Sequence, residues 1–368
     1  MTDDPILDLF CQELADEVRS QNYKLPPFEP MEISPWLAMS LLQKAIRRDR
    51  EDLALSAAAT LLLTSPQRFW RRIAVIAFED IGIANFHLVS LVTVALRGKI
   101  WRAKIGGEWA VASYLVRRMA RSPKCRAADD LAIAASYHPD FEQKRLQLTF
   151  RPLKQLLTIM LGSRNLLERS IALWYTIGTD RCPVETMRER RGDPAAVFAS
   201  LAEVGIPEKV VVIAREGFRR TNAMLCPLSI LLWQKSYSSV SQIEPEVLPP
   251  EVLVGDVPGW AFDMHVREGN IYLKRLLGRD CETARWVKEN VPPHLRVIFL
   301  GGILFRIESG LVAQRLNWVT ANRLREIVDR KCSDMPGLDA AEIITLFRHD
   351  LPLLNQIRCG EAPDDRRA

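Results

Sequence analysis

Two consecutive helices with clear boundary signals, within residues 41–84, constrain the fold more than any other part of the sequence. Ser65 followed by Pro66 marks the start of the second helix, because serine accepts a free backbone N–H and proline tolerates the first helical position. Gly82 marks its end, since glycine adopts left-handed backbone conformations at little cost. We expect Asp49 to cap the first helix. The segment therefore predicts a helical pair.

The second helix of this pair has an unusual distribution of charge. Its apolar residues recur at every fourth position and predict a buried stripe: Phe69, Ile73, Ala77 and Ile81. Arginines at 68, 71 and 72 precede Glu79 and Asp80, although the helix dipole favours acids first and bases last. Local helix stability does not explain this order, so we expect a tertiary contact or a partner to account for it.

Helical periodicity covers most of the chain, and proline-containing connectors separate its blocks. Residues 225–237 fit either a buried helix or a strand. The chain is expected to be all-α, with two main helical regions. The expected divisions are an acidic arm and connector (1–35), a helical domain (36–142), a second helical block (143–240), a proline-rich loop (241–262), a C-terminal helical block (263–359) and a frayed tail (360–368).

Charge is distributed unevenly along the chain. Residues 1–35 hold 2 Lys/Arg against 8 Asp/Glu, a net charge of −6, whereas residues 36–150 hold 18 against 10, a net charge of +8. A basic surface attracts nucleic acid or acidic protein segments, and an acidic arm can compete for it. Soluble arginine-rich helices would give the same composition, so both interpretations stay open.

Four segments carry a resemblance to a known family: LLQKAIRR (41–48), DREDLAL (49–55), WRRIAVIAFEDIGIAN (70–85) and MARSPKCRAADDLAIAA (119–135). Residues 36–138 resemble the helical C-terminal region of the RarA/MgsA family, AAA+ ATPases related to clamp loaders that act at stalled replication forks. The resemblance implies a clamp-loader-collar-like helical domain that mediates oligomer assembly. The chain contains no G-x-x-x-x-G-K-[ST] motif and no Walker B pattern. We therefore expect the ATPase module to be missing and no ATP hydrolysis.

Basic side chains are the main candidates for binding nucleic acid. Contacts of arginine and lysine with phosphates position a protein on DNA without reading its sequence. For Arg47 and Arg48, pairing with nearby acids is the favoured interpretation. The predicted DNA-contacting residues are Arg71, Arg72, Arg117, Arg118, Arg121, Lys124 and Arg126.

The nearest approach to a catalytic group is Asp263, His265 and Arg267, which alternate after a Pro-Gly-Trp turn. Histidine could act as a base, aspartate could orient it, and arginine could hold a phosphate. The favoured alternative is a helix-starting salt bridge between Asp263 and Arg267, with a structural histidine. No metal-binding, cofactor or nucleophile motif is present.

The sequence also indicates the compartment. Seven cysteines are scattered singly without a C-x-x-C pair, which favours reduced thiols. The opening residues are acidic where an export signal is basic, and no apolar run reaches the ~20 residues of a membrane span. We expect a cytoplasmic protein that does not enter a membrane.

These observations predict a non-enzymatic adaptor of DNA replication or repair. It would form homo-oligomers or dock on a partner through residues 36–138 and contact DNA through its arginine clusters. A nucleic-acid-processing enzyme centred on Asp263, His265 and Arg267 is one alternative. The other is a protein-only scaffold of a mobile-element or defence system, whose basic face meets acidic protein.

Overall fold

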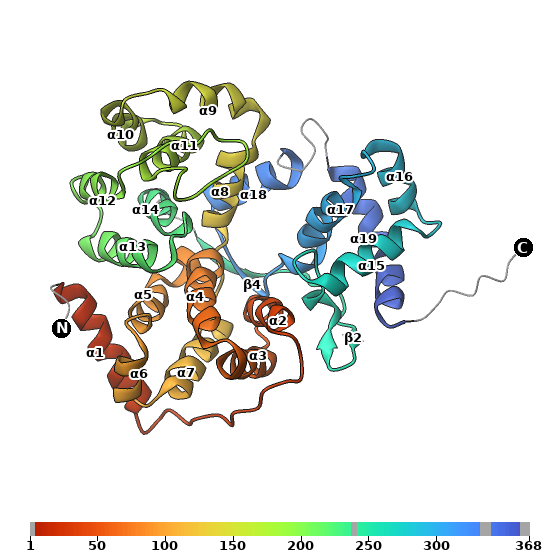
Figure 1. The fold of residues 1–368 in the computed structure, drawn as a ribbon, viewed down its shortest axis with the longest axis horizontal. Helices are drawn as coiled ribbons and strands as arrows, with labels where there is room; N and C mark the ends of the chain where they lie inside the picture. Colours follow the sequence, from red (N-terminus) through yellow and green to blue (C-terminus); the bar gives the residue numbers. More distant parts are fainter. Residues whose placement is uncertain (1–3, 237–240, 332–339, 361–368) are drawn as a thin grey trace, which may run out of the picture.

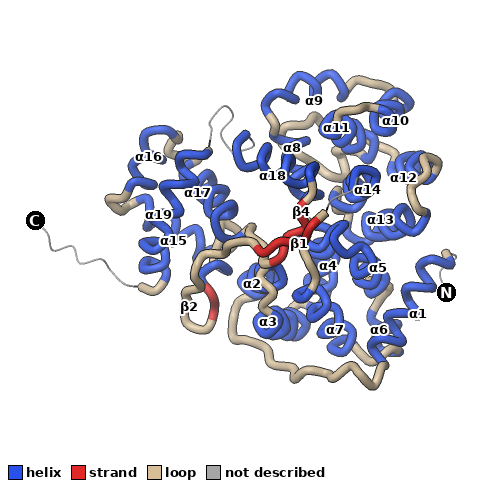
Figure 2. Tube along the Cα trace, turned by 180° about the vertical axis from the view of Figure 1, so that it is seen from behind, coloured by secondary structure: helices blue, strands red, loops and turns tan. Residues whose placement is uncertain are grey.

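The computed structural model of the protein describes residues 4–236, 241–331 and 340–360 (Figure 1). The described chain is an assembly of many helices with only short strands, which confirms the all-α fold class. The helices form two groups, a large one and a smaller C-terminal one, that lie side by side (Figures 1 and 2).

The first part of the large group is helical, as its apolar periodicity predicts, and it includes the short helix α6. A π-helical turn, η1, and a 3₁₀ turn, η2, separate α4 from α5. The elements are α1 (Pro5–Arg19), α2 (Pro35–Arg47), α3 (Glu51–Thr64), α4 (Pro66–Ile76), η1 (Ala77–Ile81), η2 (Gly82–Asn85), α5 (Phe86–Ala95), α6 (Lys99–Lys104), α7 (Glu108–Arg121) and α8 (Ala127–Tyr137).

The second helical block completes the large group, and the ambiguous apolar segment in it is a helix, α14. Its elements are η3 (Pro139–Phe141), α9 (Glu142–Thr149), α10 (Leu153–Gly162), α11 (Leu166–Ile177), α12 (Pro194–Ala202), α13 (Glu208–Thr221) and α14 (Leu225–Ser236).

Short strands connect the two groups. Strands β1 (Gln242–Pro245) and β4 (Gln314–Asn317) pair antiparallel, with Gln242 opposite Asn317, and Lys124 bridges the other side of β4. This ribbon lies at the centre of the molecule (Figure 2). The remaining elements are β2 (Leu253–Val254), β3 (Val257–Pro258), η4 (Gly259–Ala261), α15 (Arg267–Leu277), α16 (Glu282–Asn290), α17 (Arg296–Leu304), the π-helical turn η5 (Phe305–Ser309), α18 (Val319–Lys331) and α19 (Ala341–Arg358).

Helix α18 joins the large group although its neighbours in sequence belong to the small one. Its apolar residues Ala321, Leu324 and Val328 pack into the large core, next to α8 (Figure 1). Helices α15, α16, α17 and α19 enclose a separate core around Phe299 and Phe347. The chain thus forms α15 to α17 in the small group, contributes α18 to the large group, and returns to the small group with α19.

The predicted boundary signals hold in part. Pro66 occupies the first turn of α4, but the side chain of Ser65 makes no capping hydrogen bond. The expected cap by Asp49 is wrong, because Arg50 holds that position and Asp49 has a positive φ of 57°. The carboxylate of Asp49 instead accepts a hydrogen bond from Lys124. The predicted stripe of Phe69, Ile73, Ala77 and Ile81 is completely buried, as expected.

The stretch Pro66–Ala95 is long and apolar enough to cross a membrane, contrary to the expectation that no such run exists. However, 67% of its apolar window is buried inside the protein, and the turns η1 and η2 interrupt it. Its apolar character is explained by its position in the core of the large group.

Gly82 is required where η1 ends. Its φ is +51°, and a Cβ at this position would lie 2.6 Å from the carbonyl oxygen of Cys125. We expect Gly82→Ala to lower the free energy of unfolding by roughly 2–4 kcal/mol, because a strained backbone and a steric clash add together. Urea unfolding measures the change. Gly162→Ala, where a Cβ meets nothing within 4 Å, is the control and should change stability little. Equal effects of the two substitutions would contradict this role for Gly82.

Candidate functional site

The buried carboxylate of Asp80 lies at the centre of a polar cluster inside the large group. It accepts hydrogen bonds from Gln43 Nε2 at 2.9 Å, Arg47 Nε at 2.8 Å and Arg126 Nη1 at 2.5 Å. Burial alone would raise the pKa of Asp80, but the charges of Arg47 and Arg126 outweigh it and hold the pKa below its usual value. The helix end that carries this carboxylate is therefore stabilised by tertiary ion pairs.

Arg47 and Arg126 also connect other parts of the molecule. Arg47 Nη2 lies 2.7 Å from Glu79, and its Nη1 donates to the carbonyl oxygen of Ser309 at 2.9 Å. Both guanidinium groups lie over the ring of Phe305, at 5.2 and 5.0 Å from its centroid. The expected pairing of Arg47 with nearby acids is confirmed. Arg126, a predicted DNA contact, is buried within this cluster.

Lys124, another predicted DNA contact, is completely buried. Its ammonium group pairs with Asp49 and donates to the carbonyl oxygens of Ala120 and Ser122, both at 2.6 Å. Burial lowers the pKa of Lys124 in spite of the neighbouring carboxylate. The family-like Pro-Lys pair is thus an internal support for the α7–α8 turn in this structure.

The three candidate catalytic residues are not joined by side-chain hydrogen bonds in the described structure. Asp263 is buried, and its carboxylate pairs with Lys44 Nζ at 2.8 Å and accepts the backbone N–H of His265 at 3.0 Å. Its recorded bonds therefore do not orient the imidazole of His265. Arg267 is exposed at the start of α15, and the expected Asp263–Arg267 salt bridge is replaced by the pair with Lys44.

A cavity of about 430 Å³ between the two helical groups collects residues from distant parts of the chain. Arg72, Arg126 and His265 line it, together with Asp129 and Asp130. Burial raises the pKa of Asp130 to about 6 in spite of the nearby arginines. The sequence carries no local signal for this cavity, because η5 and α18, which form its other walls, lie about 170–200 residues after Asp130 in the chain. Among the described residues, no group of three His, Cys, Asp or Glu is suited to hold a metal ion.

Three of the predicted DNA-contacting arginines lie together near the end of α7. Arg117, Arg118 and Arg121 line a small pocket of about 280 Å³ with Lys24 and two tyrosines, Tyr23 and Tyr114. Glu51 pairs with Arg117 at 2.7 Å and with Arg121 at 2.6 Å.

On α4, Arg71 is exposed, whereas Arg72 is half-buried and donates to the side chain of Gln43. The predicted nucleic-acid residues thus differ in their exposure. Arg71 and Arg121 are exposed, Arg72, Arg117 and Arg118 are half-buried, and Lys124 and Arg126 are buried.

Neutralising Asp80 should destabilise the protein strongly. Asp80→Asn removes the buried carboxylate that Arg47 and Arg126 share, although Glu79 and Asp129 still pair with these arginines, and breaking a buried pair typically costs about 3–5 kcal/mol. Asp52→Asn breaks only the exposed pair with Arg50 and should cost less than about 1 kcal/mol. Urea unfolding at pH 7 compares the two variants, and similar losses would refute the central role of Asp80.

Asp130 should make the protein less stable as the pH rises. Its pKa in the folded protein, about 6, lies above the value of about 3.9 expected in an unfolded chain. The unfolded state therefore loses its proton first, and stability falls between about pH 4 and pH 6. In Asp130→Asn this contribution should disappear, so the free energy of unfolding at pH 7 minus that at pH 4 should be more positive in the variant than in the wild type. An unchanged difference would contradict the assignment.

No family model, no curated protein and no solved structure matches this chain. The likeness to the RarA/MgsA family rests on the quoted sequence segments and stays a prediction.

Proposed function

We propose that the protein is a non-enzymatic, cytoplasmic adaptor of DNA replication or repair that holds DNA through the surface at the end of α7. The observation that carries the proposal is the pocket formed by Lys24, Arg117, Arg118 and Arg121. Four cations gather there, whereas Glu51 is the one acid bonded to them among the described residues. Such a surplus of positive charge favours phosphate binding.

The geometry supports contacts with the DNA backbone more than with bases. The side chain of Arg121 is 69% exposed, and Lys24 is exposed beside it. Tyr114 is buried and packs edge-on against Tyr23 with ring centroids 5.4 Å apart, so the two rings form the wall of the pocket. Arginine and lysine contacts with phosphates carry no sequence information. We therefore propose binding with little sequence preference.

The adaptor role rests on the family resemblance of residues 36–138. Some large apolar side chains in this region are exposed, notably Trp36, Leu63 and Ile100. Arg68 lies over the ring of Trp36 at 5.1 Å, which orders that side chain at the surface. Exposed apolar groups of this kind suit contacts with a second copy or a replication protein. The structure offers less to an enzyme, because the Asp263 carboxylate bonds to Lys44 and to the backbone N–H of His265 rather than to the imidazole of His265.

DNA binding should depend on the α7 arginines and on salt. We expect fluorescence anisotropy to detect binding to single-stranded, double-stranded or forked DNA, with affinity that falls steeply as salt rises. Replacing Arg118 and Arg121 with alanine should weaken binding about tenfold or more at low salt. It should also reduce the slope of log K against log[salt] by about one for each lost phosphate contact.

The double variant Arg219→Ala/Arg220→Ala is a matched control, because it removes two arginines from the last turn of another helix, α13. It should bind DNA like the wild type, and light scattering on the same samples gives the oligomer mass. Absence of binding to every DNA at low salt would refute the proposal and favour the protein-only scaffold. Equal losses in both double variants would show that the α7 surface has no special role.

A further inference from the structure

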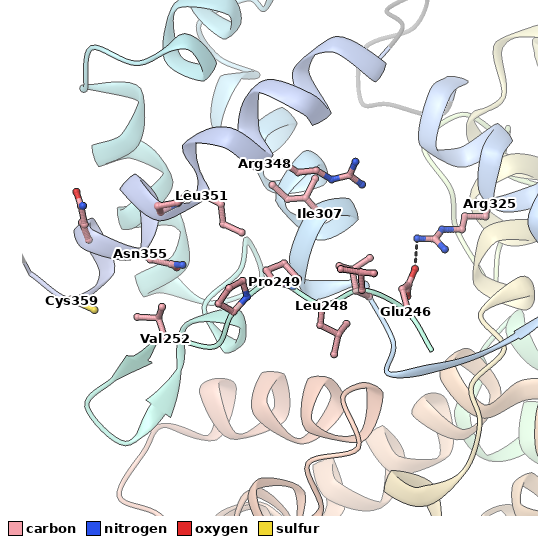
Figure 3. Close-up of a pocket in the computed structure, with 15 residues that line it drawn as sticks. Glu246, Leu248, Pro249, Val252, Ile307, Arg325, Arg348, Leu351, Asn355 and Cys359 are labelled. Carbon is pink, nitrogen blue, oxygen red and sulfur yellow. Dashed lines mark ion pairs between the residues drawn. The ribbon is translucent and has the colours of Figure 1, made fainter. Parts of the chain in front are cut away.

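A wide apolar groove, separate from the proposed DNA surface, lies between α19 and the extended segment that follows β1. Its volume is about 960 Å³. Figure 3 shows this segment along one side and α19 along the other, with Ile307 of η5 behind them. The lining is mostly apolar and includes Val247, Leu248, Pro249, Ile307, Leu351 and Pro352. Cavities of this size and character are typical of small-molecule sites.

The extended segment is held in place at both ends, so the groove is formed in advance. At one end, the carboxylate of Glu246 accepts the backbone N–H of Val312 at 2.8 Å and lies 3.2 Å from Arg315 Nη2. At the other end, Val252 accepts the backbone N–H of Gly259 at 2.7 Å. Between these anchors Val247 is 91% exposed, although it is apolar. A ligand that covered this surface would gain the free energy of apolar burial.

One end of the groove carries positive charge. Arg348 of α19 extends across it toward Arg325 of α18 (Figure 3). Arg325 is ion-paired with Glu246 and lies 3.7 Å from Asp329, so its charge is compensated. Arg348 is exposed, and the described part of the chain offers it no ion pair. The groove thus combines a long apolar wall with the guanidinium group of Arg348, which has no acidic partner among the described residues.

We propose that this groove binds an amphipathic carboxylate, with its aliphatic chain along Leu248, Pro249 and Leu351 and its anionic head on Arg348. A guanidinium group matches a planar carboxylate through two parallel hydrogen bonds, and the apolar walls take up methylene groups. Charge complementarity selects an anionic head, since Glu246 is already neutralised by two arginines. The inference does not depend on the proposed DNA binding.

Isothermal titration calorimetry of the full-length protein with octanoate, decanoate and dodecanoate, each below its micelle concentration, tests the proposal. We expect saturable binding of one molecule per chain, with Kd falling about fourfold for each added methylene. Dodecyltrimethylammonium has the same chain with a cationic head, and it should bind at least tenfold more weakly than dodecanoate.

Two variants identify the groove as the binding site. Arg348→Glu should raise the Kd for dodecanoate at least tenfold and reduce the preference for the anionic head. Leu248→Glu should weaken the binding of both dodecanoate and dodecyltrimethylammonium, because it places a charge where the aliphatic chain would lie. Both residues lie outside the two apolar cores, so folding should be preserved, and thermal melting checks this.

Arg323→Glu is the matched control, since this exposed arginine of α18 lines a different cavity. It should leave the Kd for dodecanoate unchanged. No saturable binding, equal affinity for the two heads, or an unchanged Kd in Arg348→Glu would each overturn the proposal. A failure here would leave DNA binding at α7 unaffected, so the two proposals are tested separately.

Discussion

The ion pairs of the buried Asp80 carboxylate with Arg47 and Arg126 are the interaction on which the rest of the structure depends. They connect α2, the turn η1 and the start of α8, and Arg47 extends the connection to Ser309 in η5. A buried charge is tolerated only where partners compensate its lost hydration. The position of each of these elements is therefore tied to the positions of the others. This requirement explains why Glu79 and Asp80 stand at the end of the α4–η1 segment, where the helix dipole disfavours acids.

The same requirement reduces the basic surface available to partners. Arg47, Lys124 and Arg126 contribute to the net charge of residues 36–150, yet all three bond to internal acids or carbonyl groups. The net charge of a sequence segment therefore overstates the positive charge that is exposed for binding nucleic acid. The charge that remains at the end of α7 is smaller but concentrated in one pocket, and this concentration makes it the better candidate for phosphate contacts.

The arrangement of the small helical group creates two further features. Its contact with the large group encloses the polar cavity around Asp130, where burial raises the pKa of a carboxyl group. On its other side, α19 and the extended segment leave an apolar groove with Arg348 at one end, which has no ion pair with any described residue. The first feature is balanced internally by arginines, whereas the second exposes apolar side chains such as Val247. That difference is why the groove, rather than the cavity, is proposed as a binding site.

The sequence by itself determined the helices, because apolar spacing and residues such as Pro66 and Gly82 act locally. It predicted a mostly helical chain, the pair of helices within residues 41–84 and the buried stripe of α4. Tertiary structure alone decided which charges are exposed, because burial depends on segments far apart in the chain. Asp49 was expected to cap a helix but pairs with Lys124, and Asp263 pairs with Lys44 rather than with the imidazole of His265. Ion pairs between distant segments leave no periodic pattern in the sequence, so only the folded chain reveals them.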